Sequence, residues 1–346
     1  MSVDDRSPGP IEDPIAYFLQ DITYHGKSQR THDAYERVLR RCESHLETNG
    51  VDLSNASTRD CMSWVHSLRD HHADSTVATY ASYVHRFYSY MLQVELFERN
   101  PMALVIEEMD ESIDTDPSRR DLDVPAMRGF LETVGHPLDR AVMVMALKTG
   151  MRVGELCNLD IRDIHLAGAD VRDATGVSVR GGLDGRPDSI FVSAAPERGA
   201  SYNGERRTAS NKRKRDTVVP IDPELARVLR TWLTIRPDTR TEAEPLFLST
   251  RDSWGQRLTP GMVRNAVRRH ASAHGWHAGA ADAASNVTPH YFRHFFTTHM
   301  RARTGDRGIV KYLRGDVASD IIDTYTHNWG GRVREVYERE IFRLLV

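Results

Sequence analysis

The chain has few lysines and few cysteines. Of its 46 basic residues only five are lysines, at positions 27, 148, 212, 214 and 311. Genomic base composition is sufficient to explain this bias toward arginine. The three cysteines, Cys42, Cys61 and Cys157, show no CxxC spacing. This pattern indicates neither a disulfide framework nor a cysteine-based zinc site.

The sequence also lacks a long hydrophobic run and an excess of positive charge. Its most apolar stretch, Ala141–Leu147, is far too short to span a bilayer, and no secretory signal opens the chain. We therefore expect a cytoplasmic protein with no membrane contact. The net charge of −3 does not by itself indicate nucleic-acid binding. A surface for nucleic acid would have to come from local clusters of basic residues.

Length and composition indicate a globular protein of two domains. The 346 residues are 40% hydrophobic and 27% charged. Residues 1–10 are expected to be a disordered leader, residues 11–105 a helical domain, residues 106–123 a polar and acidic linker, and residues 124–346 a second domain.

The helical domain shows four amphipathic patterns. They cover Asp13–Tyr24, Thr31–Thr48, Thr58–His71 and Ser75–Gln93, and Asn100-Pro101 ends the bundle. Tyr80, Tyr83 and Tyr90 lie in the last pattern. Two interpretations of these tyrosines remain open, packing in the core or contact with a partner.

The second domain combines helices with short β-favouring runs. The helical patterns are Val124–Val134, Pro137–Lys148, Asp222–Ile235, Thr259–His274 and an amphipathic helix at Arg332–Val346; the β-favouring runs are Val177–Arg180, Ser189–Ser193 and Thr217–Ile221. The C-terminal helix could pack on its own domain or on a neighbouring protomer.

One helix start near the C-terminus carries a pair of groups suited to a phosphodiester. Thr288 can cap a helix that Pro289 opens, which places His290 and Arg293 on one face. A guanidinium can bind two phosphate oxygens, and an imidazole adds a donor. The pair alone is weak, because surface helices often carry such residues by chance.

Two further motifs strengthen the pattern. Downstream, Tyr325 lies between small polar residues and offers a phenol as a nucleophile. Upstream, an apolar helix stops at Gly150, and Arg152 lies in the first turn of the next helix, where an anion is favoured. With these three motifs in this order, the chain resembles the tyrosine recombinase (phage integrase) family over roughly residues 12–346.

The resemblance implies a mainly α fold with a small β-sheet. It consists of an N-terminal four-helix core-binding (SAM-like) domain and a C-terminal α+β catalytic domain, and the two clamp DNA between them. Arg152, His290, Arg293 and Tyr325 match the family's catalytic residues. The family's catalytic lysine lies on a β-hairpin, and counting back from Pro220 selects Lys212, with Lys214 as the substitute. Because 60 positions separate Arg152 from Lys212, an inserted loop is expected within residues 181–210.

The chain departs from the family at Asp316. The family usually has histidine or tryptophan there, whereas an ionised carboxylate only accepts hydrogen bonds. Asp316 could instead orient Arg152, Arg293 or the Tyr325 hydroxyl. His294 is a further candidate for supporting the site.

The resemblance further implies metal-free and cofactor-free cleavage of double-stranded DNA at a specific site. The intermediate would be a 3′-phosphotyrosyl bond, formed within a synaptic homotetramer of a protein that is monomeric or dimeric off DNA. The candidates for DNA contact are Arg30, Arg37, Arg40, Arg41, Arg86, Arg213 and Arg215. Two alternatives remain, a catalytically silent DNA-binding regulator and a type IB topoisomerase-like strand transferase.

Overall fold

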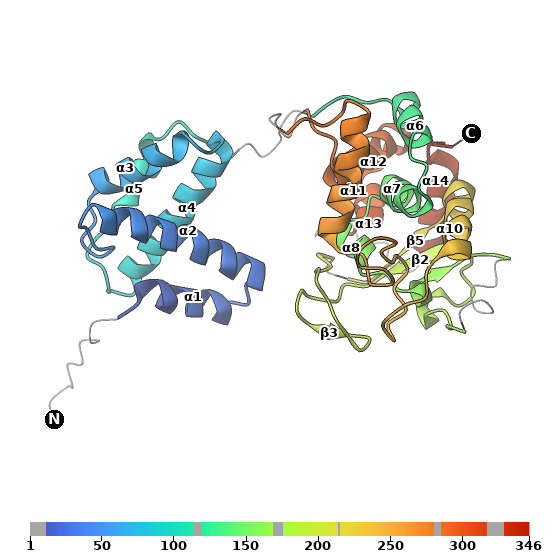
Figure 1. Cartoon of the computed structure of the whole chain (residues 1–346), viewed down its shortest axis with the longest axis horizontal. Coiled ribbons are helices and arrows are strands. Elements are labelled where there is room, and N and C mark those ends of the chain that lie inside the picture. The colour runs from blue at the N-terminus through green and yellow to red at the C-terminus, as the bar shows by residue number, and fades with distance from the viewer. Residues whose placement is uncertain are drawn as a thin grey trace. The chain divides into compact units, whose positions relative to one another are not determined.

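The chain forms two compact units, Met1–Pro117 and Ser118–Val346 (Figure 1). The computed structural model describes residues 12–113, 119–168, 176–213, 215–279, 285–316 and 329–345. The predicted fold class, mainly helical with a small sheet, is confirmed. None of the described helices is both long and apolar enough to cross a membrane.

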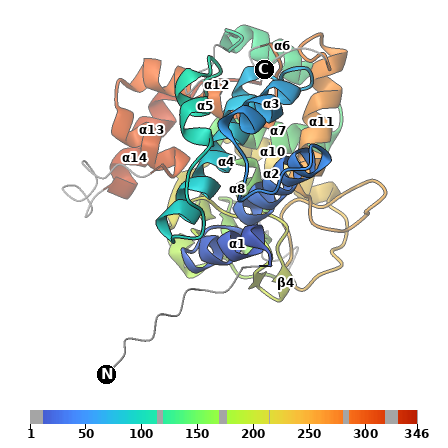
Figure 2. The same cartoon turned by 90° about the vertical axis from the view of Figure 1, so that its left-hand side faces the viewer.

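The first unit is a helical bundle (Figure 2). Its helices are α1 (Pro14–Tyr24), α2 (Gln29–Thr48), α3 (Thr58–Arg69), α4 (Asp74–Gln93) and α5 (Met102–Glu108). Polar caps begin several of them. Asp13 accepts a hydrogen bond from the first turn of α1, and Ser57 and Asp60 form a reciprocal capping box on α3.

The aromatic residues of this unit pack in its core. Phe18, Trp64 and Phe87 are fully buried, and the rings of Tyr35 and Tyr83 stack with centroids 4.1 Å apart. The tyrosines of α4 that the sequence singles out, at positions 80, 83 and 90, are partly buried against this core. Core packing therefore accounts for these side chains.

The prediction of four helices in the first unit was wrong by one helix. Helix α5 follows Pro101 directly and buries Met102 and Val105. Proline ends a helix that precedes it, but it also fits at a helix start, where its missing N–H would be unpaired in any case. The Asn100-Pro101 signal therefore marked a boundary between two helices of one bundle.

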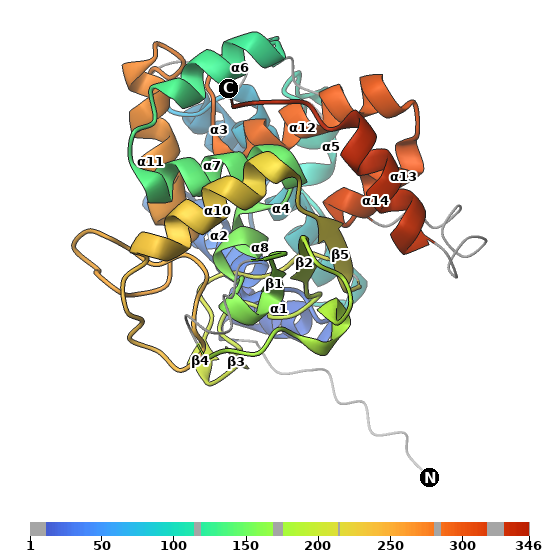
Figure 3. The same ribbon diagram turned by 90° about the vertical axis from the view of Figure 1, so that its right-hand side faces the viewer.

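The second unit is built around α7 (Pro137–Thr149), against which α10 (Pro223–Ile235) and α12 (Pro289–Thr304) both pack (Figure 3). Every residue of α7 from Leu138 to Thr149 is buried except Arg140. The other elements are α6 (Val124–Glu132), α8 (Val153–Cys157), α11 (Pro260–Ala273), α13 (Arg307–Arg314), α14 (Trp329–Glu340) and the short 3₁₀ helices η1 (Ile161–Asp163) and η2 (Gly181–Leu183).

The main sheet is antiparallel with strand order β1-β2-β5. Its strands are β1 (Ile164–His165), β2 (Ser189–Val192) and β5 (Thr217–Pro220). Two of the three predicted β-favouring runs became strands, but Val177–Arg180 did not. Arg180 instead ion-pairs with the buried Asp163 at 2.7 Å and places its guanidinium over the Phe191 ring.

The chain between β2 and β5 adds a small hairpin, β3 (Ser201–Tyr202) and β4 (Glu205–Arg206). A fully buried carboxylate, Asp160, anchors it. Asp160 accepts hydrogen bonds from Arg207 at 3.0 Å and from Arg257 at 2.5 Å, and also from Asn203 in the turn of the hairpin. Residues 181–210, where an inserted loop is expected, thus contain this hairpin and the core strand β2.

The C-terminal helix is shorter than predicted. Helix α14 ends at Glu340, whereas the sequence predicted a helix to Val346. Beyond it, the N–H groups of Leu344 and Leu345 donate to Glu224, so they do not continue the helical ladder. Phe342 and Leu344 are fully buried, which shows that this segment packs on its own domain.

A buried lysine fastens this segment to α7. The Lys148 ammonium donates to Asp222 at 2.7 Å and to the Phe342 carbonyl at 2.6 Å, and it ion-pairs with Glu224 at 2.6 Å. The Tyr337 hydroxyl donates to the Lys148 carbonyl at 3.0 Å. The C-terminal segment is therefore tied to the helix that leads into the Arg152 turn.

Candidate active site

Arg152 owes its position to the turn between α7 and α8. Gly150 ends α7 with φ of +62°, and a Cβ there would lie 2.4 Å from the Phe296 ring, so only glycine fits. Arg152 then caps α8. Glu155, which is fully buried, accepts from the Arg152 backbone N–H at 2.9 Å and from its guanidinium at 3.0 Å. The backbone and side chain of Arg152 are therefore both fixed by one carboxylate.

Arg293 lies on α12, whose start is capped by Thr288 as the sequence predicts. It is only 3% exposed. Its Nη1 donates to the carbonyls of Gly150 at 2.6 Å and Arg314 at 2.9 Å. Burial and the neighbouring guanidiniums of Arg314 and Arg152 lower the pKa of Arg293 to about 9. It therefore stays protonated at neutral pH in a site with an excess of positive charge.

The structure brings Arg152 and Arg293 together on Asp316. Arg152 Nη2 lies 2.7 Å and Arg293 Nη2 lies 2.6 Å from the same oxygen, Asp316 Oδ1. Arg314 Nη2 lies 3.0 Å from Asp316 Oδ2. We call the point at Asp316 Oδ1, where the two Nη2 groups converge, the anion position. It combines residues more than 140 positions apart in the sequence.

His290 lies one helical turn before Arg293, in the first turn of α12, and is exposed. Partial desolvation and the nearby guanidiniums of Arg119, Arg293 and Arg314 lower the pKa of His290 below its usual 6.5. The imidazole is therefore neutral at neutral pH and can accept a proton. His294, one turn further, is half-buried, with its ring centroid 6.0 Å from that of Tyr291.

Lys212 is exposed, although its neighbours in the chain are buried. It makes no hydrogen bond or ion pair with any residue that the structure describes. The preceding residue, Asn211, donates to the carbonyls of Ser193 and Ala195 at 2.9 Å each and accepts from Asn158 at 2.8 Å. Asn158 caps the end of α8, so these amides attach the Lys212 segment to the helix that Arg152 begins.

A close backbone approach reinforces this attachment. A Cβ at Gly154, on α8, would lie 2.7 Å from the Ser210 carbonyl oxygen. Only glycine lets the Lys212 segment pack this tightly on α8. The positions of Tyr325 and Lys214, the predicted nucleophile and the substitute lysine, lie outside the described residues.

Arg213 is corrected from a DNA-contact candidate to a buried structural residue. It is 4% exposed, and its guanidinium donates to Thr217 at 2.5 Å and to the Leu313 carbonyl at 3.1 Å. It also lies 3.4 Å from Glu155. No face of this side chain is left for a phosphate.

The remaining DNA-contact candidates are distributed over both units. Arg30, Arg37, Arg41, Arg86 and Arg215 are exposed. Arg40 differs, because it forms ion pairs with Asp13 and Glu43 within its own unit. A phosphate would have to compete with these carboxylates for Arg40.

Sequence reasoning missed two residues of the arginine cluster, Glu155 and Arg314. Glu155 stands three residues after the N-cap, where a carboxylate reaches back to the cap N–H, so its position did carry a signal. Arg314 had none, because its role depends on α13 ending beside α12. With Asp316 and Arg213 included, four guanidiniums face two carboxylates. This excess favours a bound anion.

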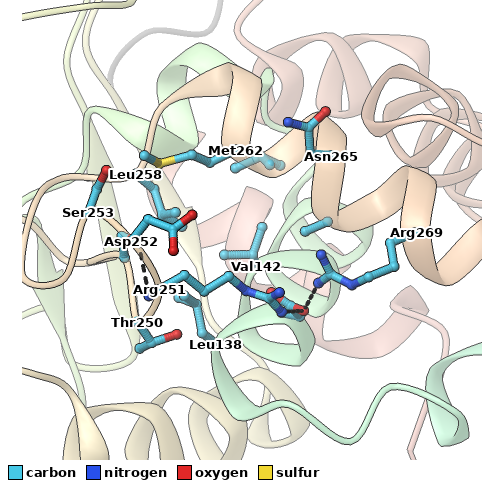
Figure 4. Close-up of a pocket in the computed structure, with 14 residues that line it drawn as sticks. Leu138, Val142, Thr250, Arg251, Asp252, Ser253, Leu258, Met262, Asn265 and Arg269 are labelled. Atoms are coloured by element: carbon cyan, nitrogen blue, oxygen red, sulfur yellow. Dashed lines mark hydrogen bonds and ion pairs between the residues drawn. The ribbon is translucent and has the colours of Figure 1, made fainter.

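A separate pocket of about 210 Å³ lies beside α7, α11 and the loop before α11 (Figure 4). Val142 and Leu258 contribute to its apolar lining. The carboxylate in its wall, Asp139, is already ion-paired with Arg269 at 2.6 Å and Arg251 at 3.5 Å. The pocket contains none of the predicted catalytic residues.

Known proteins resemble the chain in sequence. Two family models match the chain, "Phage integrase, N-terminal SAM-like domain" over residues 15–94 and "Phage integrase family" over residues 199–330. The tyrosine recombinase XerC of Pelobacter propionicus is 26% identical over 340 residues, which cover 95% of each chain.

Solved structures share the fold. The Tn1549 transposon integrase in complex with a circular intermediate DNA matches with a TM-score of 0.64 and 18% identity, over 94% of this chain and 98% of that one. A lambda integrase tetramer bound to a Holliday junction matches with a TM-score of 0.60 and 16% identity, over 89% and 77%. Motif order, fold and family models agree, and the chain belongs to the phage integrase family.

Proposed function

We propose that this protein is a site-specific DNA recombinase that cuts and rejoins double-stranded DNA through a 3′-phosphotyrosyl intermediate. The observation that carries the proposal is the anion position, where Arg152 and Arg293 direct donors at a single oxygen. Two guanidiniums from different helices that converge in this way suit the non-bridging oxygens of a scissile phosphate.

The arginines would stabilise the charge that develops during cleavage. Attack on a phosphodiester monoanion adds negative charge to the non-bridging oxygens in the transition state. Arg152 and Arg293 are held by Glu155 and the Gly150 carbonyl before DNA arrives, so little reorganisation accompanies the reaction. Removal of one such preorganised donor typically costs about 100- to 1,000-fold in rate.

Tyr325 is the proposed nucleophile, on the strength of its sequence motif. A phenol with a pKa near 10 is ionised to only roughly one part in a thousand at neutral pH, so a proton acceptor is needed. His290 has the required neutral imidazole. Attack by the Tyr325 oxygen forms the phosphotyrosyl bond and breaks the bond from phosphorus to the 5′-oxygen.

Lys212 is the proposed general acid for the departing 5′-oxygen. Its exposed ammonium has no ion pair or hydrogen bond with any described residue, so none of these has to be broken before it donates a proton. Its segment is attached to α8 through the Asn211–Asn158 hydrogen bond. The new 5′-hydroxyl takes its proton from Lys212. The energy of the phosphodiester is retained in the phosphotyrosine, so a 5′-hydroxyl of another strand can reverse the step without ATP.

The proposed partner is DNA carrying a specific site, bound by a homotetramer during strand exchange. The lambda integrase relative is described as a tetramer on a Holliday junction. Exposed arginines on α2 and α4, such as Arg37 and Arg86, supply phosphate contacts in this proposal. Such an enzyme acts where the cell's DNA lies, which we propose is the cytoplasm.

Covalent capture tests the function. The full chain is incubated with a library of randomised duplexes that carry nicks, so that cleavage releases a short strand and traps the complex. Protein-linked DNA is recovered after denaturation and sequenced. We expect enrichment of one site, and we expect Tyr325→Phe to bind that site normally but form no covalent complex.

Three results would separate the alternatives. Site-specific binding without covalent product from the wild type indicates a silent regulator. Covalent product without sequence enrichment, from a monomer, indicates a topoisomerase. Covalent product from Tyr325→Phe moves the nucleophile to another tyrosine, such as Tyr312.

A further inference from the structure

Asp316 occupies the point at which the two catalytic arginines converge. Its Oδ1 accepts from Arg152 and Arg293, the arrangement expected for a non-bridging phosphate oxygen, and its Oδ2 contacts Arg314. A carboxylate and a phosphodiester each carry one negative charge and offer oxygens to paired donors. In shape and charge, the Asp316 side chain resembles the proposed ligand of this position.

The Nη1 groups of the two arginines already have partners. Arg152 Nη1 donates to Glu155, and Arg293 Nη1 donates to the carbonyls of Gly150 and Arg314. The Nη2 groups are therefore the ends that face the anion position, and both bind Asp316. A phosphate can take over these two hydrogen bonds only by displacing the carboxylate.

We propose that Asp316 is an internal competitor that fills the anion position until the scissile phosphate displaces it. The proposal rests on the proposed function for the identity of the ligand. A histidine or tryptophan at this place would contribute a donor to the phosphate, whereas a carboxylate withdraws two donors and repels it. Asp316 thus sets a threshold for anion binding.

Displacement is sterically feasible because Asp316 lies at the edge of the cluster. Its side chain is 25% exposed, whereas the Arg293 side chain beneath it is 3% exposed. The carboxylate can therefore turn toward solvent while the arginines stay in place.

The threshold gives a selectivity for DNA over small anions. Free phosphate must displace Asp316 with its own contacts alone, whereas a phosphate in bound DNA is delivered by contacts elsewhere on the duplex. Minor conformational states are commonly populated to at most about 10%. If the conformation in which the Asp316 carboxylate has left the anion position is populated to that extent, Asp316 weakens the affinity for an anion by about tenfold or more.

Orthophosphate is the first probe. Its affinity for the full chain is measured by thermal shift for wild type, Asp316→Asn, Asp316→Ala and Asp252→Asn. Asp252 is exposed in the loop before α11, so the last variant changes the net charge equally away from the site. We expect Asp316→Asn and Asp316→Ala to bind orthophosphate about tenfold or more tightly than wild type, and Asp252→Asn to bind it as wild type does. Adding Arg293→Ala to either Asp316 variant should abolish the gain in affinity.

Single-turnover cleavage is the second probe, because a purely structural role of Asp316 could also change stability. The substrate is the nicked site recovered by covalent capture, with and without orthophosphate. We expect Asp316→Asn to cleave at least as fast as wild type without phosphate. We also expect millimolar orthophosphate to inhibit this variant several-fold at concentrations that leave wild type unaffected.

Two outcomes overturn the proposal. Unchanged orthophosphate affinity in two folded Asp316 variants shows that the carboxylate does not compete. Slow cleavage that phosphate does not inhibit shows that Asp316 only positions the arginines. If wild type never forms a covalent complex, the proposed function fails, and the orthophosphate titration still decides the role of Asp316.

Discussion

The amide pair Asn158–Asn211 positions the segment of Lys212, the proposed general acid, so Asn211→Ala should reproduce the defect of Lys212→Ala. The substitution removes three hydrogen bonds, which leaves the Ser193 and Ala195 carbonyls and one N–H of the Asn158 amide without these partners. The other N–H of that amide still donates to the Ala209 carbonyl. At about 1–3 kcal/mol for each buried polar group, the segment loses on the order of 3 kcal/mol of local stability.

The effect on rate follows from the role of Lys212. A positioned general acid contributes about 100- to 10,000-fold, and we expect a large part of this factor to be lost. The assay compares ordinary DNA with a substrate whose bridging 5′-oxygen is sulfur. A thiolate departs without a proton, so cleavage of the sulfur substrate by Asn211→Ala and Lys212→Ala should approach the wild-type rate.

The controls separate positioning from general damage. Arg215→Ala, an exposed neighbour, should show only a salt-sensitive weakening of binding. Slow cleavage of both substrates by Asn211→Ala would refute the positioning argument, because it would mean that the arginine site itself is disturbed. Failure of Lys212→Ala to be rescued would instead move the proton donor to Lys214 or His290.

Three further predictions concern single side chains. Arg293→Lys and Arg152→Lys should each lower the single-turnover cleavage rate by about 100-fold or more, because an ammonium cannot reproduce the forked donors; near-wild-type cleavage would place that arginine outside the site. Lys148→Met should lower the free energy of unfolding in urea by about 3–5 kcal/mol, because it leaves buried carboxylates unpaired, whereas the exposed Lys311→Met should not. The pKa of His290 is lowered in the folded protein, so the neutral imidazole that acts as base is still present below pH 6.5. Cleavage should therefore persist below pH 6.5 and fall only at lower pH. A His290→Gln variant whose cleavage rate falls at the same low pH would contradict the role of His290 as base.

Several helices could be predicted because their signals are local. Thr288-Pro289 caps α12, and Asp13 and Ser57 begin α1 and α3 as capping chemistry requires. The same local logic placed Arg152 at the start of α8. These assignments depend on neighbours within one turn, which a sequence displays directly.

The errors arise where distant contacts override local preference. Val177–Arg180 has β-favouring residues, but β1 takes the place beside β2 and Arg180 pairs with Asp163. The C-terminal helix stops early because Glu224, more than 100 residues away, binds the backbone that follows. No periodicity within either segment reports such a partner.

In the candidate active site, too, local features could be predicted and long-range contacts could not. The candidate residues Arg152 and Arg293, which the structure brings together, were visible as motifs, but the burial of Arg213 and the convergence on Asp316 were not. Four basic residues in a row indicate an exposed tip, yet alternate side chains of an extended segment point in opposite directions. Lys212 therefore faces solvent while Arg213 enters the domain.

The Asp160 anchor has a consequence for how related chains can diverge. Arg207 directly follows the hairpin β3–β4, whereas Asp160 and Arg257 belong to the body of the domain. Glu205 of β4 ion-pairs with both arginines, so a relative without the hairpin would lose Arg207 together with Glu205 and keep Asp160 and Arg257 as a balanced buried pair. Positions 205 and 207 should therefore vary together across the family, with Asp160 and Arg257 retained wherever the hairpin is missing.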